Sequence, residues 1–305
     1  MSSEKHLITT LGKCAYADVG WMLAHEHIFA NFAADDDHCI DSAAVVARML
    51  PELERAKGVG ISALVDATAI GAARRPDILA ALSQAADFPI LAATGWFKEP
   101  AKWDWALEHS NSALCAWLVT ELTTGIGNSA VRAGWIKLSV TDSGVQPHEA
   151  RLISAAAGAS RATGAVVGCH TVGGPLAHAV LDIFEAAGGD PSRFIWIHTQ
   201  TEPDINVHLD FARRGAWIEY DAIDQDPADQ VYSDWILQVL DAGFGNQLLL
   251  SQDRVGYDPG QPEGGVFKPY SALTETFIPK LRGRGVDTAG IEMLLHDNPF
   301  RAYAR

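Results

Sequence analysis

The chain has 305 residues, of which 48% are hydrophobic and 20% charged, and this length suits one large globular domain or two small ones. Its formal net charge of −15 disfavours nucleic acid and anionic membranes as partners, because both would repel an acidic surface. The chain has no apolar run long enough to span a bilayer, no apolar secretion-signal segment near its start, and four cysteines without metal-ligand or disulfide-type spacing, so we expect a cytoplasmic protein.

Eight apolar stretches of strand length recur along the chain, each nearly continuous in its hydrophobicity, as strands covered on both faces are. They span 19–25, 61–67, 89–95, 133–140, 165–169, 193–197, 215–220 and 246–252. Ala- and Leu-rich stretches of helical character alternate with them, over 42–57, 75–86, 104–122, 146–162, 174–187, 203–213, 228–242 and 270–281.

This alternation predicts parallel strands joined by crossover helices. Eight such units in a chain of this size predict an α/β fold, a (β/α)8 TIM barrel with its active site at the carboxyl ends of the strands, formed by residues 1–305 as a single domain. A doubly wound open sheet is the structural alternative. It would be expected to carry a Gly-rich phosphate-binding turn after its first strand, and the sequence has none there.

Residues of metal-ligand type lie at the predicted carboxyl ends of several strands. His25 and His27 end the first strand, in the sequence LAHEHIF, and strand alternation sends both imidazoles to one face and Glu26 to the other. Two neutral imidazoles on one face are half of a transition-metal site. The other candidates are Lys137 in the fourth strand, His170 after the fifth, His198 after the sixth and Asp253 after the eighth.

Each of these residues also has an ordinary structural role open to it. A lone histidine at a strand end is usually a hydrogen-bonded polar residue, an aspartate there commonly caps the next helix, and a lysine in a strand usually reaches toward water. These explanations are independent of one another, and six coincidences at one rim are hard to accept. The joint pattern therefore favours a metal site.

The lysine carries the most information about the kind of metal site. A charged ammonium group is a poor neighbour for metal ions, but burial lowers the pKa of a lysine amine. The neutral amine of Lys137 can take up carbon dioxide and become a carbamate, which has the charge and shape of a carboxylate and can bridge two divalent ions. Two ions about 3.5 to 4 Å apart can share one hydroxide and polarise the oxygen of the bond that it attacks.

Five segments, which include the HEH motif and the surroundings of Lys137, occur in the order in which one protein family has them. They are HEH at 25–27, VDAT at 65–68, AATGWF at 92–97, RAGWIK at 132–137 and DNPFR at 297–301. Together they resemble the phosphotriesterase family of the amidohydrolase superfamily, and the resemblance covers nearly the whole chain.

The resemblance implies a role for each candidate ligand. His25, His27 and Asp253 would hold a more buried metal, His170 and His198 a more exposed one, and a carbamate on Lys137 would bridge the two together with a hydroxide. Asp253 and Lys137 would be the catalytic residues, with Asp253 accepting a proton as a general base. The more exposed metal would act as a Lewis acid. The ligand set favours zinc, and manganese, cobalt or iron would fit too.

Three positions depart from the family pattern. Paraoxon-hydrolysing members use an Asp–His relay, whose positions align with about Thr201 and with Ala222, so neither relay residue is present. The lactonase branch usually has a tyrosine two residues after the strand-three glycine and an arginine at the position of Ala222. Here the first is Phe97 and the second is absent, so the chain also departs from the homoserine-lactone-hydrolysing branch.

Four residues are candidates for substrate binding. Trp96 and Phe97 either line an apolar pocket wall or pack beneath the rim. Arg254 meets either a substrate carboxylate or a structural one. Tyr257 lies in a Gly- and Pro-rich segment, 254–265, that suggests a mobile loop over the site. The Trp-containing segment 98–105 corresponds to a region that often contributes to a dimer interface in this family, so we expect a homodimer.

These features predict a binuclear metal-dependent hydrolase of a small-molecule substrate, in which a metal-bridging hydroxide attacks a lactone or carboxylic ester. Hydrolysis of a phosphoric ester is the alternative reaction, although Arg254 is the one basic residue that we find near the strand ends and a phosphate usually needs more. A metal-retaining ligand-binding barrel with little catalysis is the alternative of another class. A serine hydrolase is not expected, because the sequence has no GxSxG motif.

Overall fold

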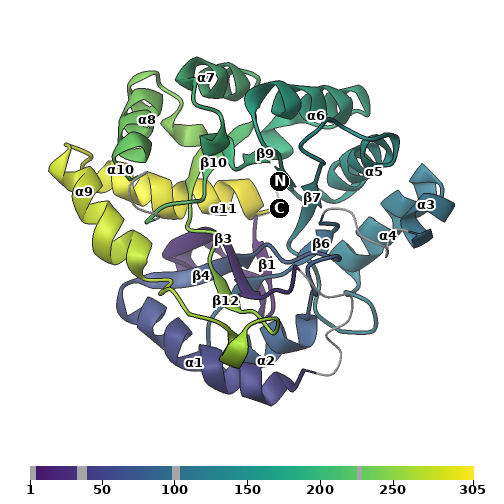
Figure 1. Cartoon of the computed structure of the whole chain (residues 1–305), viewed down its shortest axis with the longest axis horizontal. Helices are drawn as coiled ribbons and strands as arrows, with labels where there is room; N and C mark the ends of the chain where they lie inside the picture. Colours follow the sequence, from purple (N-terminus) through teal and green to yellow (C-terminus); the bar gives the residue numbers. More distant parts are fainter. Residues whose placement is uncertain (1–4, 33–39, 98–103, 225–228) are drawn as a thin grey trace.

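A computed structural model describes residues 5–32, 40–97, 104–224 and 229–305 (Figure 1). Its central strands are parallel, and all eight predicted strand regions contain one. They are β3 (Trp21–Phe29), β4 (Ile61–Asp66), β5 (Ile90–Leu91) with β6 (Ala93–Gly95), β7 (Trp135–Ser139), β8 (Val167–His170), β9 (Phe194–Ile197), β10 (Trp217–Tyr220) and β11 (Leu248–Leu250).

The strands form two hydrogen-bonded groups that meet at both ends. One group runs from β6 through β11 in chain order, and the other joins β3, β4 and β5. Only Ala92 separates β5 from β6, which joins the groups at one side. At the other side, the Asp253 amide donates to the His25 carbonyl at 3.2 Å, and the His27 amide donates to the Arg254 carbonyl at 2.8 Å. The chain after β11 therefore lies against β3 and closes the ring.

Helices encircle the strands, as the alternating sequence pattern predicts (Figure 1). Each crossover lies within or close to its predicted range: α1 (Ser42–Gly58), α2 (Pro76–Ala86), α3 (Asp104–Glu108), α4 (Asn111–Thr123), α5 (Pro147–Thr163), α6 (Gly174–Ala186), α7 (Ile205–Arg213), α8 (Asp229–Asp241) and α9 (Ile278–Gly283), the last preceded by a π-helical turn, Leu273–Phe277. The carboxyl-terminal part adds α10 (Thr288–Glu292), a second π-helical turn, Met293–Asp297, and α11 (Asn298–Tyr303).

The first strand is longer than predicted, and this changes where its histidines lie. We expected it to end at residue 25, but β3 continues to Phe29 because a further short strand, β12 (Val255–Tyr257), pairs with its second half. His25 and His27 are therefore inside the strand and not at its end. Segment 254–265, which we expected to be a loop over the site, begins with this strand.

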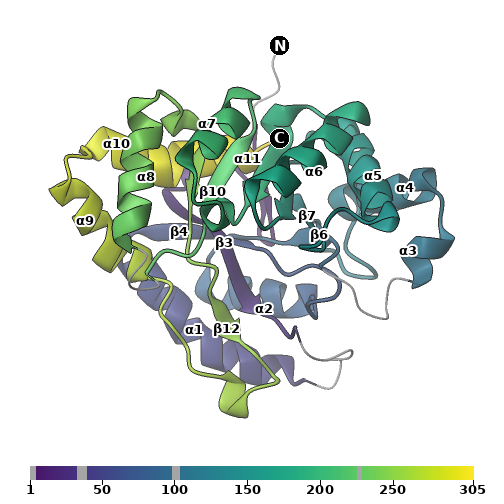
Figure 2. The same ribbon diagram turned by 45° about the horizontal axis from the view of Figure 1, so that its top comes forward.

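The amino-terminal end of the barrel is closed by the two ends of the chain. A hairpin of β1 (Leu7–Thr9) and β2 (Gly12–Cys14) lies there, and His6 and Arg305 exchange two backbone hydrogen bonds of 3.1 and 3.2 Å. The carboxyl terminus lies close to α11, which leads to it, and Figure 2 shows both in the upper part of the molecule. Tyr303 of α11 reaches the barrel interior, where its hydroxyl donates to the Ala24 carbonyl at 2.9 Å. The opposite end of the barrel, where the strands have their carboxyl ends, is not covered by the chain termini and carries the candidate metal ligands. In the described part of the chain, no helix is both long and apolar enough to cross a membrane.

Candidate metal centre

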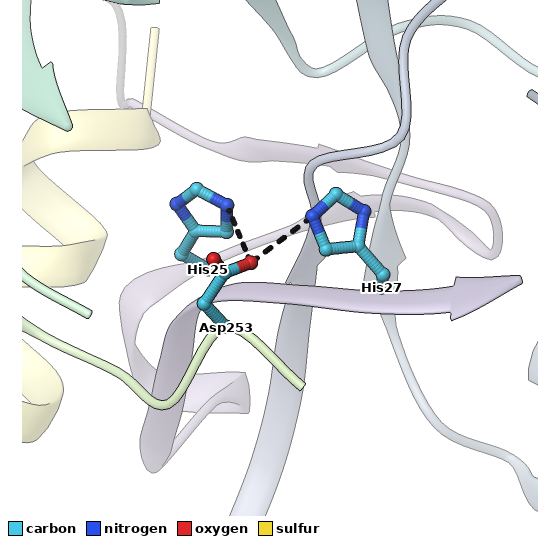
Figure 3. Close-up of side chains that lie close together, drawn as sticks. All are labelled: His25, His27 and Asp253. Atoms are coloured by element: carbon cyan, nitrogen blue, oxygen red, sulfur yellow. Dashed lines mark ion pairs between the residues drawn. The ribbon is translucent and has the colours of Figure 1, made fainter. Parts of the chain in front are cut away.

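Strand alternation in β3 sends His25 and His27 to one side and Glu26 to the other, as the sequence predicts. Both imidazoles are buried, at 1% and 3% exposure, and their Nε2 atoms converge on one carboxylate oxygen. Asp253 Oδ1 lies 3.3 Å from Nε2 of His25 and 3.1 Å from Nε2 of His27 (Figure 3). Glu26 faces the chain on either side of Asp253 instead.

Lys137 enters the same space from β7. Its Nζ lies 3.2 Å from Nε2 of His25, and the side chain is 1% exposed. Burial lowers the pKa of the Lys137 amine, although the nearby carboxylate of Asp253 opposes this shift. Burial also lowers the pKa of His25 to about 4, so this imidazole is neutral at physiological pH. A neutral imidazole and a weakly basic amine side by side are suited to metal ligation.

His198 and His170 complete the group that the sequence predicts. His198 directly follows β9 and His170 ends β8, and their ring centroids lie 4.4 Å apart. The rings of His25 and His198 are 5.6 Å apart, which joins this pair to the first. Ligand atoms of His198, Asp221 and Asp253 lie within 4.8 Å of one another, as do those of His25, His27 and Asp253. The structure therefore brings all six predicted ligands together.

Three of the four imidazoles are oriented through their second nitrogen. Nδ1 of His25 lies 2.7 Å from Glu219 Oε1, and Nδ1 of His198 lies 2.7 Å from Asp221 Oδ1. The ionised carboxylate of Asp221 accepts hydrogen bonds, so Nδ1 of His198 carries the proton and its Nε2 carries the lone pair. Nδ1 of His27 similarly lies 2.7 Å from the Thr68 hydroxyl. This arrangement fits a metal site, because it leaves Nε2 of His25 and of His27 directed at Asp253.

Glu219 and Asp221 are functional residues that our ligand assignment did not include. Glu219 lies in β10 and Asp221 directly follows that strand, within WIEYD, so the alternation of the extended chain sends both side chains to the same side. Burial and the neighbouring charge of Asp221 raise the pKa of Glu219 well above its usual value. Burial would also raise the pKa of Asp221, but His198 beside it holds that pKa well below the usual range. Two carboxylates two residues apart in an apolar strand are the sequence signal that could have found them.

Two of the candidate ligands have left-handed backbone conformations, which non-glycine residues rarely adopt. The φ angle is 65° at His198 and 50° at Asp253. Such a conformation persists only where the surrounding contacts impose it, and it is commonest at functional sites. At His198, one such contact is the hydrogen bond of 2.9 Å from its amide to Asp221 Oδ2.

The substrate-binding candidates lie in different environments. The Phe97 ring lies 5.5 Å from that of His170 and 5.1 Å from that of Phe32, a residue that sequence reasoning missed although it follows the first strand. Phe32 in turn lies 5.6 Å from the His27 ring and is 48% exposed. These two phenylalanines flank the cluster of ligands.

The other three candidates have partners within the fold. Trp96 is buried against Trp117, with ring centroids 4.6 Å apart, which supports the packing alternative. Arg254 is 4% exposed and donates to Asp224 Oδ2 at 3.0 Å, which supports the structural carboxylate over the substrate. The Tyr257 ring stacks on Phe29 at 5.9 Å.

The sequence profile of the Phosphotriesterase family matches residues 5–303, which is nearly the whole described chain. The chain belongs to the phosphotriesterase family. As a member of this family it is a metal-dependent hydrolase, and its His/Asp cluster is the metal-binding group.

Proteins from several organisms resemble this phosphotriesterase-family protein over most of its length. A phosphotriesterase homology protein of Mycobacterium tuberculosis is 27% identical, with 98% of both chains covered, and one of Escherichia coli is 24% identical, with 93% of this chain and 98% of the relative covered. An N-acetyltaurine hydrolase of Dictyostelium discoideum is 25% identical over 82% of this chain and 71% of its own.

Solved structures of family members confirm the predicted (β/α)8 fold. A variant of a phosphotriesterase-like lactonase of Deinococcus radiodurans superposes with a TM-score of 0.88 at 28% identity, covering 97% of this chain and 99% of its own. A variant of an organophosphorus hydrolase of the same organism gives a TM-score of 0.89 at 27% identity, covering 99% and 98%.

The structure also shows what occupies the two relay positions in this family member. The Thr201 hydroxyl donates to the His198 carbonyl at 2.8 Å and accepts from the Gly173 amide at 3.0 Å, so it ties together the two loops that carry His198 and His170. Ala222 offers only a methyl group. Neither side chain is an acid or a base near neutral pH, so neither replaces the Asp or the His of the relay.

Proposed function

We propose that this protein hydrolyses an ester-like bond in a small molecule, with two divalent metal ions bound and a lactone or carboxylic ester as substrate. The observation that carries the proposal is the convergence of the Nε2 atoms of His25 and His27 on Asp253 Oδ1, with the Lys137 amine 3.2 Å from the first of them. When bound, the two ions would lower the pKa of the attacking water and polarise the carbonyl oxygen of the substrate.

Each ligand has a definite part in this proposal. His25, His27 and Asp253 hold the more buried ion, and His170 and His198 hold the more exposed one. Lys137 joins them as a carbamate, which forms when its neutral Nζ bonds to the carbon of carbon dioxide and gives up a proton. The buried position of Lys137 supports this step, because a lowered pKa leaves the nitrogen lone pair available. We propose zinc as the metal, with manganese, cobalt or iron as substitutes.

Asp253 moves the proton in this reaction. Burial would raise the pKa of Asp253, but His25 and His27 beside it hold that pKa well below its usual value, so the group is an ionised carboxylate at neutral pH. Its Oδ1 can accept the proton that the attacking water loses and then return it to the leaving oxygen of the opened ester. With no relay at positions 201 and 222, the proton stays at this carboxylate until the leaving oxygen takes it.

The surroundings of the ligands favour an uncharged, partly apolar substrate. Phe97 and Phe32 flank His170 and His27, and aromatic rings there suit the carbon chain or ring of a lactone. Arg254, the cation nearest in sequence to Asp253, is already paired with Asp224. A phosphoric ester remains the alternative substrate, supported by a 22% identical aryldialkylphosphatase of Saccharolobus solfataricus.

The test combines metal content with a substrate panel on protein purified without chelator. The panel contains small lactones, aryl carboxylic esters, N-acetyltaurine, paraoxon and an aryl phosphodiester. We expect close to two transition metals per chain, with turnover of lactone or carboxylic ester that chelation removes and added zinc restores. Metal-replete protein that turns over only the phosphoric esters would support the alternative reaction. Metal-replete protein without any turnover would favour a ligand-binding barrel.

A further inference from the structure

We infer that Glu26, the middle residue of the HEH motif, is a positioning residue that holds Asp253 in its left-handed conformation through the backbone on both sides of it. Glu26 is completely buried and lies on the face of β3 opposite the two histidines. It does not touch the ligand atoms. The inference rests on the proposed function in one respect, because it takes Asp253 to be a metal ligand of that site.

The hydrogen bonds of Glu26 span the segment that carries Asp253. Its Oε1 accepts from the Gln252 amide at 3.0 Å, and its Oε2 accepts from the Arg254 amide at 2.7 Å. The residue between these two amides is Asp253, whose φ is 50°. One carboxylate therefore fixes the peptide before Asp253 and the peptide after it. A side chain with two acceptor oxygens is needed, because both partners are N–H donors.

A second contact connects this arrangement to the histidines. The Ser251 hydroxyl donates to Glu26 Oε1 at 2.7 Å and accepts from the His25 amide at 2.9 Å. On the far side, the Asp253 amide donates to the His25 carbonyl at 3.2 Å. Strand β3 and the chain after β11 are thereby locked in one register, which sets the position of Asp253 Oδ1 relative to His25 Nε2.

The left-handed conformation of Asp253 makes its position depend on these hydrogen bonds. Asp253 must be an aspartate to act as a ligand, so the chain cannot place glycine at a position whose φ favours it. Without the two hydrogen bonds from Glu26, we expect residue 253 to relax toward an ordinary conformation, which would turn Oδ1 away from the two Nε2 atoms.

The test is the variant Glu26→Gln, with Glu149→Gln as its matched control. The control carboxylate is equally buried and accepts the same kinds of hydrogen bond, from the Thr141 and Gln146 amides and the Thr141 hydroxyl, each at 2.7 Å. In Glu26→Gln the amide oxygen can replace one acceptor, but the NH₂ group would face a second N–H donor. Both variants lose the same kind of contact, and only one of them lies beside Asp253.

We expect the zinc affinity of Glu26→Gln, measured by chelator competition, to fall about 10- to 100-fold, as for other residues that orient a metal ligand. We expect kcat at saturating zinc to fall with KM unchanged, and Glu149→Gln to keep the affinity and kcat of the wild type. The variant Ser251→Ala keeps the Glu26 carboxylate but removes the bridging hydroxyl, so its loss of zinc affinity should be smaller. It replaces Glu26→Gln in the test if that variant does not fold.

The inference would be overturned if Glu26→Gln and Glu149→Gln bind zinc with equal affinity. If Glu26→Gln does not fold, it would be overturned by wild-type zinc affinity in Ser251→Ala. Either result would leave Glu26 as a structural residue. Crystal structures of the variants separate this outcome from a failure of the proposed function. If the wild type binds no transition metal, the proposed function fails. The φ angle of residue 253 in the variants then decides whether Glu26 controls its conformation, because an unchanged angle contradicts the inference and a relaxed one supports it.

Discussion

At the scale of single residues, both histidines of the HEH motif depend on partners that are distant in the sequence. Glu219 orients His25 from 194 positions away, and Thr68 orients His27 from 41 positions away. Asp66 in turn fixes Thr68, because its Oδ1 accepts from the Thr68 amide at 3.0 Å. The ligands themselves were predictable, since each lies at or near the end of a predicted strand. Which partner each histidine has was not predictable, because it depends on the relative register of strands that are far apart in the sequence.

Lys137 provides the sharpest test at this scale. Lys137→Ala should remove the bridge between the two metals, so we expect less than two metals per chain and a fall in kcat of at least about 100-fold, beyond the loss typical of residues that only orient ligands. Metal analysis and steady-state kinetics on the same sample measure both quantities. Lys57→Ala, which removes a half-exposed lysine at the end of α1, should leave both unchanged. Two metals and full activity in Lys137→Ala would exclude the bridging carbamate.

At the scale of helices and strands, the sequence pattern located the elements but missed three local features. The predicted helix 104–122 is two helices, because the Ser110 hydroxyl accepts from the Ala113 amide and starts α4 anew. The predicted helix 270–281 begins with a π-helical turn. The first strand extends beyond residue 25 because β12, a strand of three residues, pairs with it. Each feature depends on local hydrogen bonding, which hydrophobic periodicity does not report.

His208 of α7 makes the stability of one helix–strand contact depend on pH. Its Nδ1 lies 2.8 Å from the Tyr220 hydroxyl of β10, its Nε2 lies 2.8 Å from the Glu202 carbonyl, and burial lowers its pKa below the usual 6.5. As the pH falls below about 6.5, His208 therefore takes up a proton more readily in the unfolded chain than in the folded one. The stability that neutral His208 contributes is complete above that pH and is lost as the pH falls through and below it.

We expect the variant His208→Gln, which cannot titrate, to lose less stability between pH 7.5 and pH 5.5 than the wild type does. The free energy of unfolding in urea at the two pH values measures this difference, and taking the difference between the proteins cancels the contribution of the metal-binding histidines. At pH 7.5 the variant should be the less stable of the two, because it leaves part of a buried contact unfilled. An equal pH dependence in both proteins would show that His208 titrates alike in the folded and unfolded chains.

At the scale of the whole molecule, the homodimer stays a prediction. Most of segment 98–105 lies outside the described residues, but Trp105 and Leu107 of α3 are 40% and 48% exposed. We expect light scattering to give twice the chain mass of 32.8 kDa, and Leu107→Glu to shift the protein toward the monomer. Leu11→Glu is the control, because Leu11 is similarly exposed at 42% on the β1–β2 hairpin. A wild type that measures 32.8 kDa would contradict the prediction.

Metal binding should stabilise the whole barrel, because the ligands come from strands that are far apart in the sequence. The chain supplies His25 and His27 from β3, Lys137 from β7, His170 from β8, His198 after β9 and Asp253 after β11. Only the folded chain brings these groups together, so free zinc at about 100 times its dissociation constant should add about 2.7 kcal/mol to the free energy of unfolding.

Removal of the metal should therefore lower the melting temperature, by roughly 1.5 °C for each kcal/mol in a chain of this size. Thermal unfolding before and after dialysis against chelator measures the shift, and added zinc should reverse it. Asp253→Asn offers an internal comparison, because it keeps the shape of the side chain but removes the charge that a metal needs. In that variant the shift should be smaller than in the wild type. A shift of equal size would mean that Asp253 contributes nothing to the binding of the stabilising metal, which contradicts its assignment as a ligand.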